Sequence, residues 1–451
     1  MKVPRTPPDL PTLMRSITAE TLPLIASRKI GPLAHGHYLH WDELRHRAPP
    51  PGLDHKVWWL ALRMARSAAA NTLPLLDKAG QPFSYTLPEP LLRNLHTIDR
   101  SAGLAPGQDT PPALRAEQGR YLMSSLIDEA ITSSQLEGAS TTRRVAETML
   151  REGRKPATLS ERMIFNNFEA MRRIRDLCGE TLTPERLIAL QSVLTDGTLE
   201  NPEDCGALRR TDDIEVVAPN DERCVLHRPP RASELPMRLQ ALCDFANASQ
   251  AEGDFIHPVV RAVLLHFMIG YDHPFADGNG RTGRALFYWY MVRQGYWLAE
   301  YLSISRLLRK APAQYAYAYL HTETDNGDAT YFLLHQTGIL VRSLDALARY
   351  LARKQREQAD MQAQLRKLHL DDRSLNHRQV ALLAHALKRP DEYFTIESHQ
   401  RSHQVAYATA RADLLALVAR GLLVETLLTG RKRAYYPAPG LPARLRETTS
   451  P

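Results

Sequence analysis

The chain has 451 residues, and none of its apolar runs approaches the ~20 residues that a membrane-spanning helix requires. The stretch MKVPRTPPDLPTLM at its start lacks the apolar segment of a secretory leader, so we expect a cytoplasmic protein with no membrane contact. Its four cysteines form no CxxC pair and have no histidine at zinc spacing, which argues against disulfides and a zinc site. No GxxxxGKS/T sequence occurs, and this absence excludes a P-loop nucleotide site.

The most informative stretch is residues 273–284, HPFADGNGRTGR. Before it, apolar residues from Val259 to Tyr271 recur at helical spacing, so His273 is expected to leave the end of a helix. The glycines of the loop tolerate positive φ, so successive backbone N–H groups can point into one concavity and hold an anion. A second helix is expected from Arg281, and its N-terminal dipole adds to the attraction for phosphate.

The sequence GNGRTG also fits the dinucleotide fingerprint GxGxxG, but that pattern requires a preceding strand, and here a helix precedes it. We therefore reject a Rossmann site. A Gly/Asn turn between two helices with surface arginines is the plain structural alternative. The joint presence of His, Pro, Phe, Asp and two arginines in register favours a phosphate site instead.

The stretch matches, at every defined position, the signature HPFx(D/E)GNGRxxR of Fic (filamentation induced by cAMP) domains, and the chain thus resembles a Fic protein. Fic proteins transfer AMP from ATP to a protein hydroxyl. The resemblance implies that His273 is the general base for a target Ser, Thr or Tyr, and that Asp277 is the Mg²⁺ ligand. It also implies that Gly278, Asn279 and Gly280 form the anion hole. Arg281 is implied as a phosphate contact, and Arg284 as the clamp on the γ-phosphate.

The chemistry of these residue types agrees with the implied roles. A neutral imidazole with an ordinary pKa of roughly 6.5 accepts a proton at cellular pH, and such acid–base help contributes about 10²–10⁴ in rate. Mg²⁺ takes oxygen ligands and keeps several waters, so one protein carboxylate plus two phosphates suffices, with Mn²⁺ as an alternative ion. The chain has 17 histidines, and His266 on the preceding helix is expected to be an ordinary core or surface residue.

A second match lies upstream, where ITSSQLEGAS contains Ser133, Glu137 and Gly138. Their spacing fits the inhibitory motif (S/T)xxxE(G/N) of Fic proteins. The resemblance implies that Glu137 pairs with Arg284 and so keeps ATP out of a productive pose. We expect the helix that carries the motif to span residues 116–138, with the glycine as its stop. The alternative is an ordinary helix that ends in Glu-Gly.

Between the two motifs, residues 214–220 (IEVVAPN) and 223–230 (RCVLHRPP) read as two short strands joined by a turn. This hairpin over 214–230 resembles the flap of Fic proteins, which pairs with the target segment as an added strand. An ordinary surface hairpin is the alternative. Beyond the loop, Tyr315 and Tyr319 lie one helical turn apart, so they either contact adenine or pack in the core.

We expect a mainly α-helical chain built from about three domains. Residues 1–111 are expected to form a mainly helical N-terminal region with a Pro-rich start. Residues 112–345 are expected to form a Fic-type helical core that includes the small β-hairpin flap. A charged helical connector at 346–372 then leads to a winged helix-turn-helix domain at 373–440.

The C-terminal part carries most of the net positive charge. Residues 373–437 hold ten Lys and Arg against five Asp and Glu, which gives +5 of the formal net charge of +7. A basic stripe is typical of phosphate-backbone binding, so duplex DNA is a candidate partner. A winged helix that dimerises or recruits a protein is the alternative. The expected DNA contacts are Arg401, Arg411, Arg431, Lys432 and Arg433.

Together these patterns predict an autoinhibited protein adenylyltransferase that uses MgATP and releases diphosphate. The protein target is unknown, with the chain itself as one candidate and a homodimer as one candidate state. One alternative is another nucleotidyl or phosphoryl transfer by the same site, including removal of AMP with Glu137 positioning water. The other is a DNA-binding regulator whose core senses nucleotide, but a sensor has no need of a general base.

Overall fold

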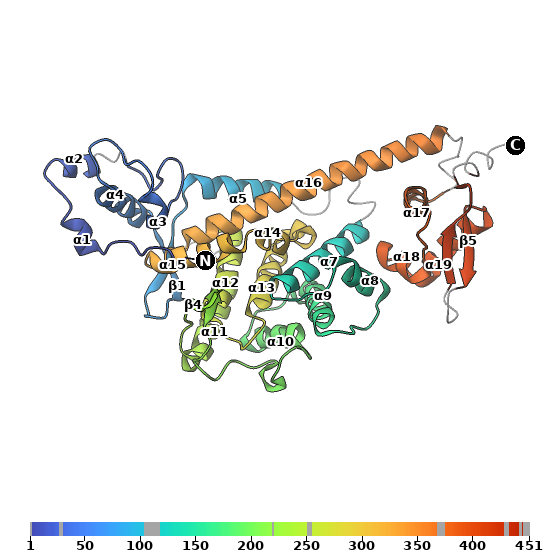
Figure 1. Cartoon of the computed structure of the whole chain (residues 1–451), viewed down its shortest axis with the longest axis horizontal. Coiled ribbons are helices and arrows are strands. Elements are labelled where there is room, and N and C mark those ends of the chain that lie inside the picture. Colours follow the sequence, from blue (N-terminus) through green and yellow to red (C-terminus); the bar gives the residue numbers. More distant parts are fainter. Residues whose placement is uncertain are drawn as a thin grey trace.

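The computed structural model describes residues 2–26, 30–102, 118–218, 221–249, 255–367, 375–427, 433–441 and 444. Over these ranges the chain is mainly helical, as the sequence predicts, and its sheets are antiparallel strand pairs. The molecule is elongated, with a small helical lobe at one end, a main body in the middle and a C-terminal unit at the other end (Figure 1). No helix in the described ranges is long and apolar enough to cross a membrane.

The N-terminal lobe has a small core of its own. Its helices are α1 (Leu10–Met14), α2 (Thr21–Ala26), α3 (Trp41–Leu44) and α4 (His55–Ala68). Asp54 caps α4, because its side chain accepts a hydrogen bond from the backbone N–H of Val57 at 2.8 Å. Trp58 and Trp59 on this helix then pack against Trp41, so the tryptophans serve the core of the lobe.

Residues 71–102 share the core of the main body, so the expected boundary at residue 111 does not separate two cores. Strands β1 (Asn71–Leu76) and β2 (Pro82–Tyr85) pair as a hairpin, and α5 (Glu89–Ala102) follows. Phe83 and Leu95 lie in the same hydrophobic cluster as the helices of the main body. Helix α5 runs beside the long helix α16 (Figure 1).

The main body is built on two adjacent helices, α12 (Pro258–Asp272) and α13 (Asn279–Arg293). Nearly all side chains of α12 are buried, because this helix is apolar on every face and lies inside the bundle. The other helices of the main body are α7 (Gln118–Leu136), α8 (Arg143–Glu152), α9 (Leu159–Leu177), α10 (Pro184–Thr195), α11 (Leu235–Asn247), α14 (Ser305–Leu308), α15 (Pro312–Thr324) and α16 (Thr330–Lys367). Short 3-10 turns are η1 (Pro202–Asp204), η2 (Ala232–Glu234) and η3 (Trp297–Tyr301).

Two stretches of the main body correspond to predicted elements. Strands β3 (Val216–Ala218) and β4 (Asp221–His227) pair as an antiparallel hairpin at the position of the expected flap. Helix α7 ends one residue before Glu137, and the start of the expected inhibitory helix at residues 116–117 lies outside the described residues.

The connector expected at 346–372 is not a separate element. Helix α16 continues without a break from Thr330 to Lys367, so the last core helix and the connector are one helix, and residues 368–372 lie outside the described residues. In Figure 1 this helix extends from the main body to the C-terminal unit.

The C-terminal unit has three helices followed by two strands. These are α17 (His377–Lys388), α18 (Ile396–His403), α19 (Tyr407–Ala419), β5 (Leu423–Leu427) and β6 (Arg433–Pro437). Phe394 forms an isolated antiparallel β-bridge with Tyr435 of β6, which extends the two-stranded sheet by one residue pair. The unit has its own hydrophobic core.

Arg66 joins the N-terminal lobe to the main body. Its guanidinium donates to the hydroxyl of Tyr331 at 2.8 Å and to the carbonyl of Leu39 at 3.0 Å. It also lies 3.7 Å from the ring centroid of Tyr38, and the carboxylate of Asp325 is 3.9 Å away. Only 5% of the Arg66 side chain is exposed, so this charge depends on its partners.

We predict that Arg66→Ala lowers the free energy of unfolding by about 3 kcal/mol, because the buried Asp325 carboxylate then loses a cation and keeps the Tyr331 hydroxyl and the more distant Arg63 guanidinium as partners. Urea unfolding followed by the fluorescence of the lobe's tryptophans measures this change. Arg93→Ala is the control, and loss of its exposed ion pair with Glu89 is expected to matter by less than about 1 kcal/mol. An equally small loss for Arg66→Ala would contradict the role of this contact.

Candidate active site

The loop of interest begins where α12 ends. His273 takes a left-handed backbone conformation (φ +46°), and its N–H donates to the carbonyl of Ile269 at 3.1 Å. Its ring Nδ1 lies 3.2 Å from the carbonyl of Gly270. A carbonyl only accepts, so Nδ1 carries the proton and Nε2 keeps the lone pair. Burial lowers the pKa of His273 below its ordinary value, which keeps the imidazole neutral at cellular pH.

Asn279 holds the shape of the loop. Its Oδ1 accepts from the N–H of Phe275 at 3.0 Å, and its Nδ2 donates to the carbonyl of Phe275 at 2.8 Å. Gly278, with φ +86°, turns the chain into α13. Because the Asn279 side chain is used within the loop, only its backbone N–H at the start of α13 is available to an anion.

Arg281 is completely buried beneath the loop. Its guanidinium donates to the carbonyl of Leu194 at 2.9 Å and to Oδ2 of Asp277 at 3.0 Å. None of its side chain is exposed, whereas 51% of the Asp277 side chain is exposed. Arg281 therefore orients the Asp277 carboxylate in this structure, and a direct contact with phosphate stays a prediction.

Asp277 fits the role of a magnesium ligand. Its Oδ1 accepts from the N–H of Gly278 at 2.5 Å, and the Arg281 contact fixes the other oxygen at the mouth of the loop. Within the described part of the chain, no group of three or more His, Cys, Asp or Glu side chains could hold a metal ion. A Mg²⁺ ion at Asp277 would therefore take its other ligands from phosphates and water, which suits this ion.

Arg284 meets both side chains of the predicted inhibitory motif. Its Nε donates to Oγ of Ser133 at 2.9 Å, and its Nη2 donates to Oε1 of Glu137 at 2.8 Å. The same Nη2 donates to the carbonyl of Ser133 at 3.1 Å. Gly138 follows with φ +94° and ends the helical segment. The expected pairing of Glu137 with Arg284 is thus present in the structure.

The Glu137 carboxylate lies inside the anion concavity. A Cβ atom placed on Gly280 would be 2.2 Å from Oε1 of Glu137 and 3.0 Å from Nη1 of Arg284. Nη1 is buried and has no hydrogen-bond partner among the described residues. The carboxylate of Glu137 therefore lies between the backbone of Gly280 and the guanidinium of Arg284. Its side chain is 27% exposed against 1% for Arg284, so the acid is the partner that can leave.

The middle of α7 is fixed by Glu129, which the sequence analysis did not single out. Its carboxylate accepts from Oγ of Ser303 at 3.0 Å and from both N and Oγ of Ser305, at 3.2 and 2.5 Å. The residue is 1% exposed, and burial raises the pKa of its carboxyl. Because α7 is held here, Glu137 can leave the concavity by moving its own side chain and the turn around it.

Arg209 is a second residue that sequence reasoning missed. Its Nε donates to the carbonyl of His273 and its backbone N–H to the carbonyl of Pro274, each at 2.9 Å. Its Nη2 donates to the carbonyl of Pro230, just beyond the flap. Arg209 therefore ties the loop to the base of the flap. It lies 64 positions before His273, so no local spacing in the sequence indicates this contact.

The two candidate adenine residues lie next to each other and are partly buried. The hydroxyl of Tyr315 is 2.8 Å from Nε2 of His266 and 3.4 Å from the hydroxyl of Tyr319. The Tyr319 ring stacks on Phe267 with centroids 5.2 Å apart. Both tyrosines pack against the core, and contact with adenine stays a prediction. His266 is 1% exposed, and burial lowers its pKa to about 3, so it is a core histidine.

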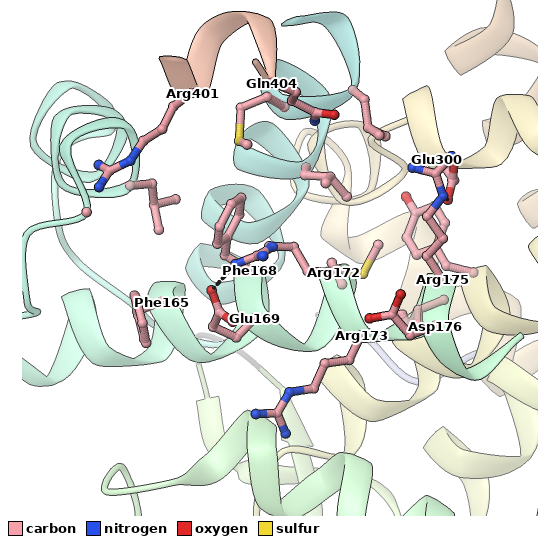
Figure 2. A pocket seen from close by; sticks show the side chains of 18 of the residues that line it. Phe165, Phe168, Glu169, Arg172, Arg173, Arg175, Asp176, Glu300, Arg401 and Gln404 are labelled. Atoms are coloured by element: carbon pink, nitrogen blue, oxygen red, sulfur yellow. Dashed lines mark hydrogen bonds and ion pairs between the residues drawn. The ribbon is translucent and has the colours of Figure 1, made fainter. Parts of the chain in front are cut away.

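Arg401, an expected DNA contact, faces the main body instead. Its guanidinium donates to the carbonyl of Arg151 at the end of α8, and a Cβ on Gly153 would lie 2.2 Å from its Nη2. Figure 2 shows Arg401 and Gln404 at the edge of a cavity of about 730 Å³ above α9. The reason for this correction is geometric: α18 is turned toward α8, so Arg401 contacts backbone of the same chain.

The other expected DNA contacts are scattered. Arg411 is exposed on α19, and Arg433 forms an ion pair with Glu425 at 2.8 Å. Arg431 and Lys432 lie outside the described residues. Of the five expected contacts, Arg411 and Arg433 are exposed in the part of the chain that the structure describes.

Several solved structures and curated proteins are similar to this chain. A Fic family protein from Desulfovibrio desulfuricans G20 aligns with a TM-score of 0.49 at 18% identity, over 78% of this chain and 97% of that chain. A fragment of Fic-1 from C. elegans aligns with a TM-score of 0.44 at 20% identity, over 59% and 72%.

Two curated relatives are both described as Protein adenylyltransferase Fic. The relative from Nematostella vectensis is 31% identical over 126 residues, which are 28% of this chain and 26% of the relative. The relative from Drosophila grimshawi is 39% identical over 70 residues, which are 16% of this chain and 14% of the relative. The chain thus spans about a quarter or less of the length of these relatives.

The family match covers the loop and the helices on either side of it, whereas Ser133, Glu137, Tyr315 and Tyr319 lie outside the matched segment. Residues 181–291 match the model of the Fic/DOC family, and this segment includes the β3–β4 hairpin, α12, the loop and most of α13. Residues 181–291 of the main body are thus similar to the Fic/DOC family.

Proposed function

We propose that the chain is a protein adenylyltransferase that transfers AMP from MgATP to a Ser, Thr or Tyr hydroxyl of a protein and releases diphosphate. The observation that carries this proposal is that His273 begins the loop whose Gly280 lies next to the buried guanidinium of Arg284. The Fic/DOC match and the adenylyltransferase names of the relatives support it.

In this proposal the neutral His273 is the general base. Its Nε2 takes the proton of the target hydroxyl, whose oxygen forms a bond to the α-phosphorus of ATP. The bond between that phosphorus and the oxygen leading to the β-phosphate breaks, and diphosphate leaves. The backbone N–H groups at the start of α13 stabilise the negative charge on the phosphates. Mg²⁺ held by Asp277 would neutralise part of the same charge.

The β3–β4 hairpin is proposed as the flap that holds the target. Both strands belong to a two-stranded sheet, so an extended segment of another protein can pair with an outer edge. Pairing of this kind uses main-chain hydrogen bonds, so it depends little on the side chains of the target. It would hold the target backbone in place while one target hydroxyl reaches His273.

Glu137 is proposed to inhibit the site. Its carboxylate occupies the contact between Gly280 and Arg284 where the γ-phosphate would bind, and two like charges cannot share that contact. ATP then lacks its clamp, so its α-phosphate is not aligned with the target hydroxyl. Removal of AMP from a modified protein by the same residues is the alternative outcome of the labelling test.

The C-terminal unit is proposed as a winged helix with duplex DNA as its partner. The observation that favours this role is the exposure of Tyr407 and Arg411 on α19. Helix α18, in contrast, packs against α8 through Arg401. Helix α19, which would enter a DNA groove, is therefore accessible.

We predict that Glu137→Gly raises labelling of the chain by α-labelled ATP about 10–10³-fold, because a free Arg284 can align the phosphates and each ~1.4 kcal/mol is tenfold in rate. Labelled protein is quantified after electrophoresis, and the adduct mass identifies AMP. His273→Ala in the same background is the control for chemistry and should abolish labelling. Arg284→Ala should cancel the gain, since the two changes act on one contact.

Unchanged or reduced labelling by Glu137→Gly would contradict inhibition by this carboxylate. Undiminished labelling by the variant with both Glu137→Gly and His273→Ala would contradict the role of His273 as base. Loss of AMP from a previously modified protein in the wild type, but not in Glu137→Gly, would favour the reverse reaction.

The pH dependence of labelling follows from the lowered pKa of His273. Burial is the main cause of the shift, and the nearby Glu137 carboxylate opposes it, so Glu137→Gly should lower this pKa further. As pH falls, the base should therefore be more than half neutral at about pH 6.5, where a free histidine would be half protonated. We predict that the rate for Glu137→Gly falls to half of its plateau only below that pH. A rate that halves at or above about pH 6.5 would contradict a buried histidine base.

A further inference from the structure

We propose that His227 is a positioning residue that sets the height of the flap above His273, and that Glu323 holds it in place. This inference rests on the proposed function and adds the part of the structure that orients the protein target. His227 is the last residue of β4 and pairs with Val216 of β3, so it stands at the base of the flap.

Both nitrogens of the His227 ring are engaged. Nε2 lies 2.7 Å from the carbonyl oxygen of Tyr271, and Nδ1 lies 2.8 Å from Oε2 of Glu323. The ring is 7% exposed, and it also packs against the Tyr271 ring with centroids 4.8 Å apart. One side chain therefore connects β4 to the end of α12 and to α15.

The contact with Tyr271 places this anchor next to the chemistry. Tyr271 lies two residues before His273, so the hydrogen bond from His227 joins the flap to the backbone that carries the base. Both partner atoms are oxygens that can accept a hydrogen bond, so each ring nitrogen of His227 has a partner of matching chemistry. A target strand paired with the flap would inherit this fixed distance to His273.

The hairpin β1–β2 also contacts Tyr271 and the end of β4. The backbone N–H of Lys78, in the turn of this hairpin, donates to the hydroxyl of Tyr271 at 3.0 Å. Its Nζ donates to the carbonyl of Arg228, the residue after β4, at 3.2 Å. In Figure 1, β1 and β4 lie together near the end of α12. The residues before the Fic/DOC segment thus take part in holding the flap.

A purely structural histidine would act differently from a positioning one. If His227 only stabilised the fold, its loss would lower ATP affinity and target labelling together. If it sets the geometry of the flap, its loss reduces use of the protein target and leaves ATP affinity unchanged. A misplacement of about 1 Å can cost about 10²-fold in rate, so the effect should be large.

The test uses the full chain with Glu137→Gly as the parent and a His273→Ala copy of the chain as the acceptor. Adding His227→Ala is expected to lower kcat/KM for the acceptor about 10–100-fold with unchanged ATP affinity. Glu323→Ala should do the same, whereas Glu323→Gln keeps an acceptor oxygen for Nδ1 and should retain most of the activity. His227→Gln can donate to one of the two acceptors and should fall between His227→Ala and the parent.

Amide hydrogen exchange gives a second readout that does not depend on activity. Exchange in residues 221–227 should be faster in His227→Ala than in the parent. Arg228→Ala, which removes the exposed ion pair of the neighbouring residue with Glu215, is the matched control and should leave this exchange nearly unchanged.

The outcomes separate the proposed adenylyltransferase function from the positioning role of His227. A parent that labels nothing would overturn the proposed function, and the exchange measurement would then decide the anchoring by itself. Unchanged kcat/KM in His227→Ala, an equal loss of ATP affinity, or unchanged exchange in residues 221–227 would overturn the positioning role of His227.

Discussion

The buried guanidinium of Arg284 is the constraint on which the site depends. Only 1% of this side chain is exposed, and a buried charge without a counter-charge is costly. An anion beside Arg284 is therefore favoured, and in the structure the carboxylate of Glu137 lies there. In the proposed function, inhibition and substrate binding are an exchange of one anion for another. Glu137 is the partner that would move in this exchange, because its side chain is more exposed than that of Arg284.

The surrounding structure keeps this exchange local. Glu129 fixes the middle of α7 to Ser303 and to Ser305 at the start of α14, so the segment that carries Glu137 has a fixed base. Asn279 holds the loop through the backbone of Phe275, and Arg209 ties the same loop to the base of the flap. The turn at Glu137 and Gly138 contacts this region through the hydrogen bond between Glu137 and Arg284. The phosphate concavity can therefore keep its shape while its anion changes.

The sequence predicted the features that depend on short, local spacing. The loop, the helix on each side of it and the flap hairpin occur where the residues indicate, and Glu137 meets Arg284 as the resemblance implies. Long-range contacts were not predictable in this way: His227 and Glu323 are 96 positions apart, and no local spacing in the sequence pairs them. The continuation of α16 through the expected connector was also missed, because helical composition without a stop signal does not separate one helix from two. The position of Arg401 depends on how α18 packs against α8, which no pattern within either helix encodes.

The claim that Glu137 occupies the γ-phosphate position is tested most directly by comparing the affinities of ATP and ADP for the wild type and for Glu137→Gly by calorimetry. ADP lacks the γ-phosphate, so it does not compete with the carboxylate for Arg284. The account predicts that Glu137→Gly binds ATP more tightly, by about tenfold or more for ~1.4 kcal/mol of recovered contact, with ADP affinity unchanged. An equal gain for both nucleotides, or no gain for ATP, would contradict it.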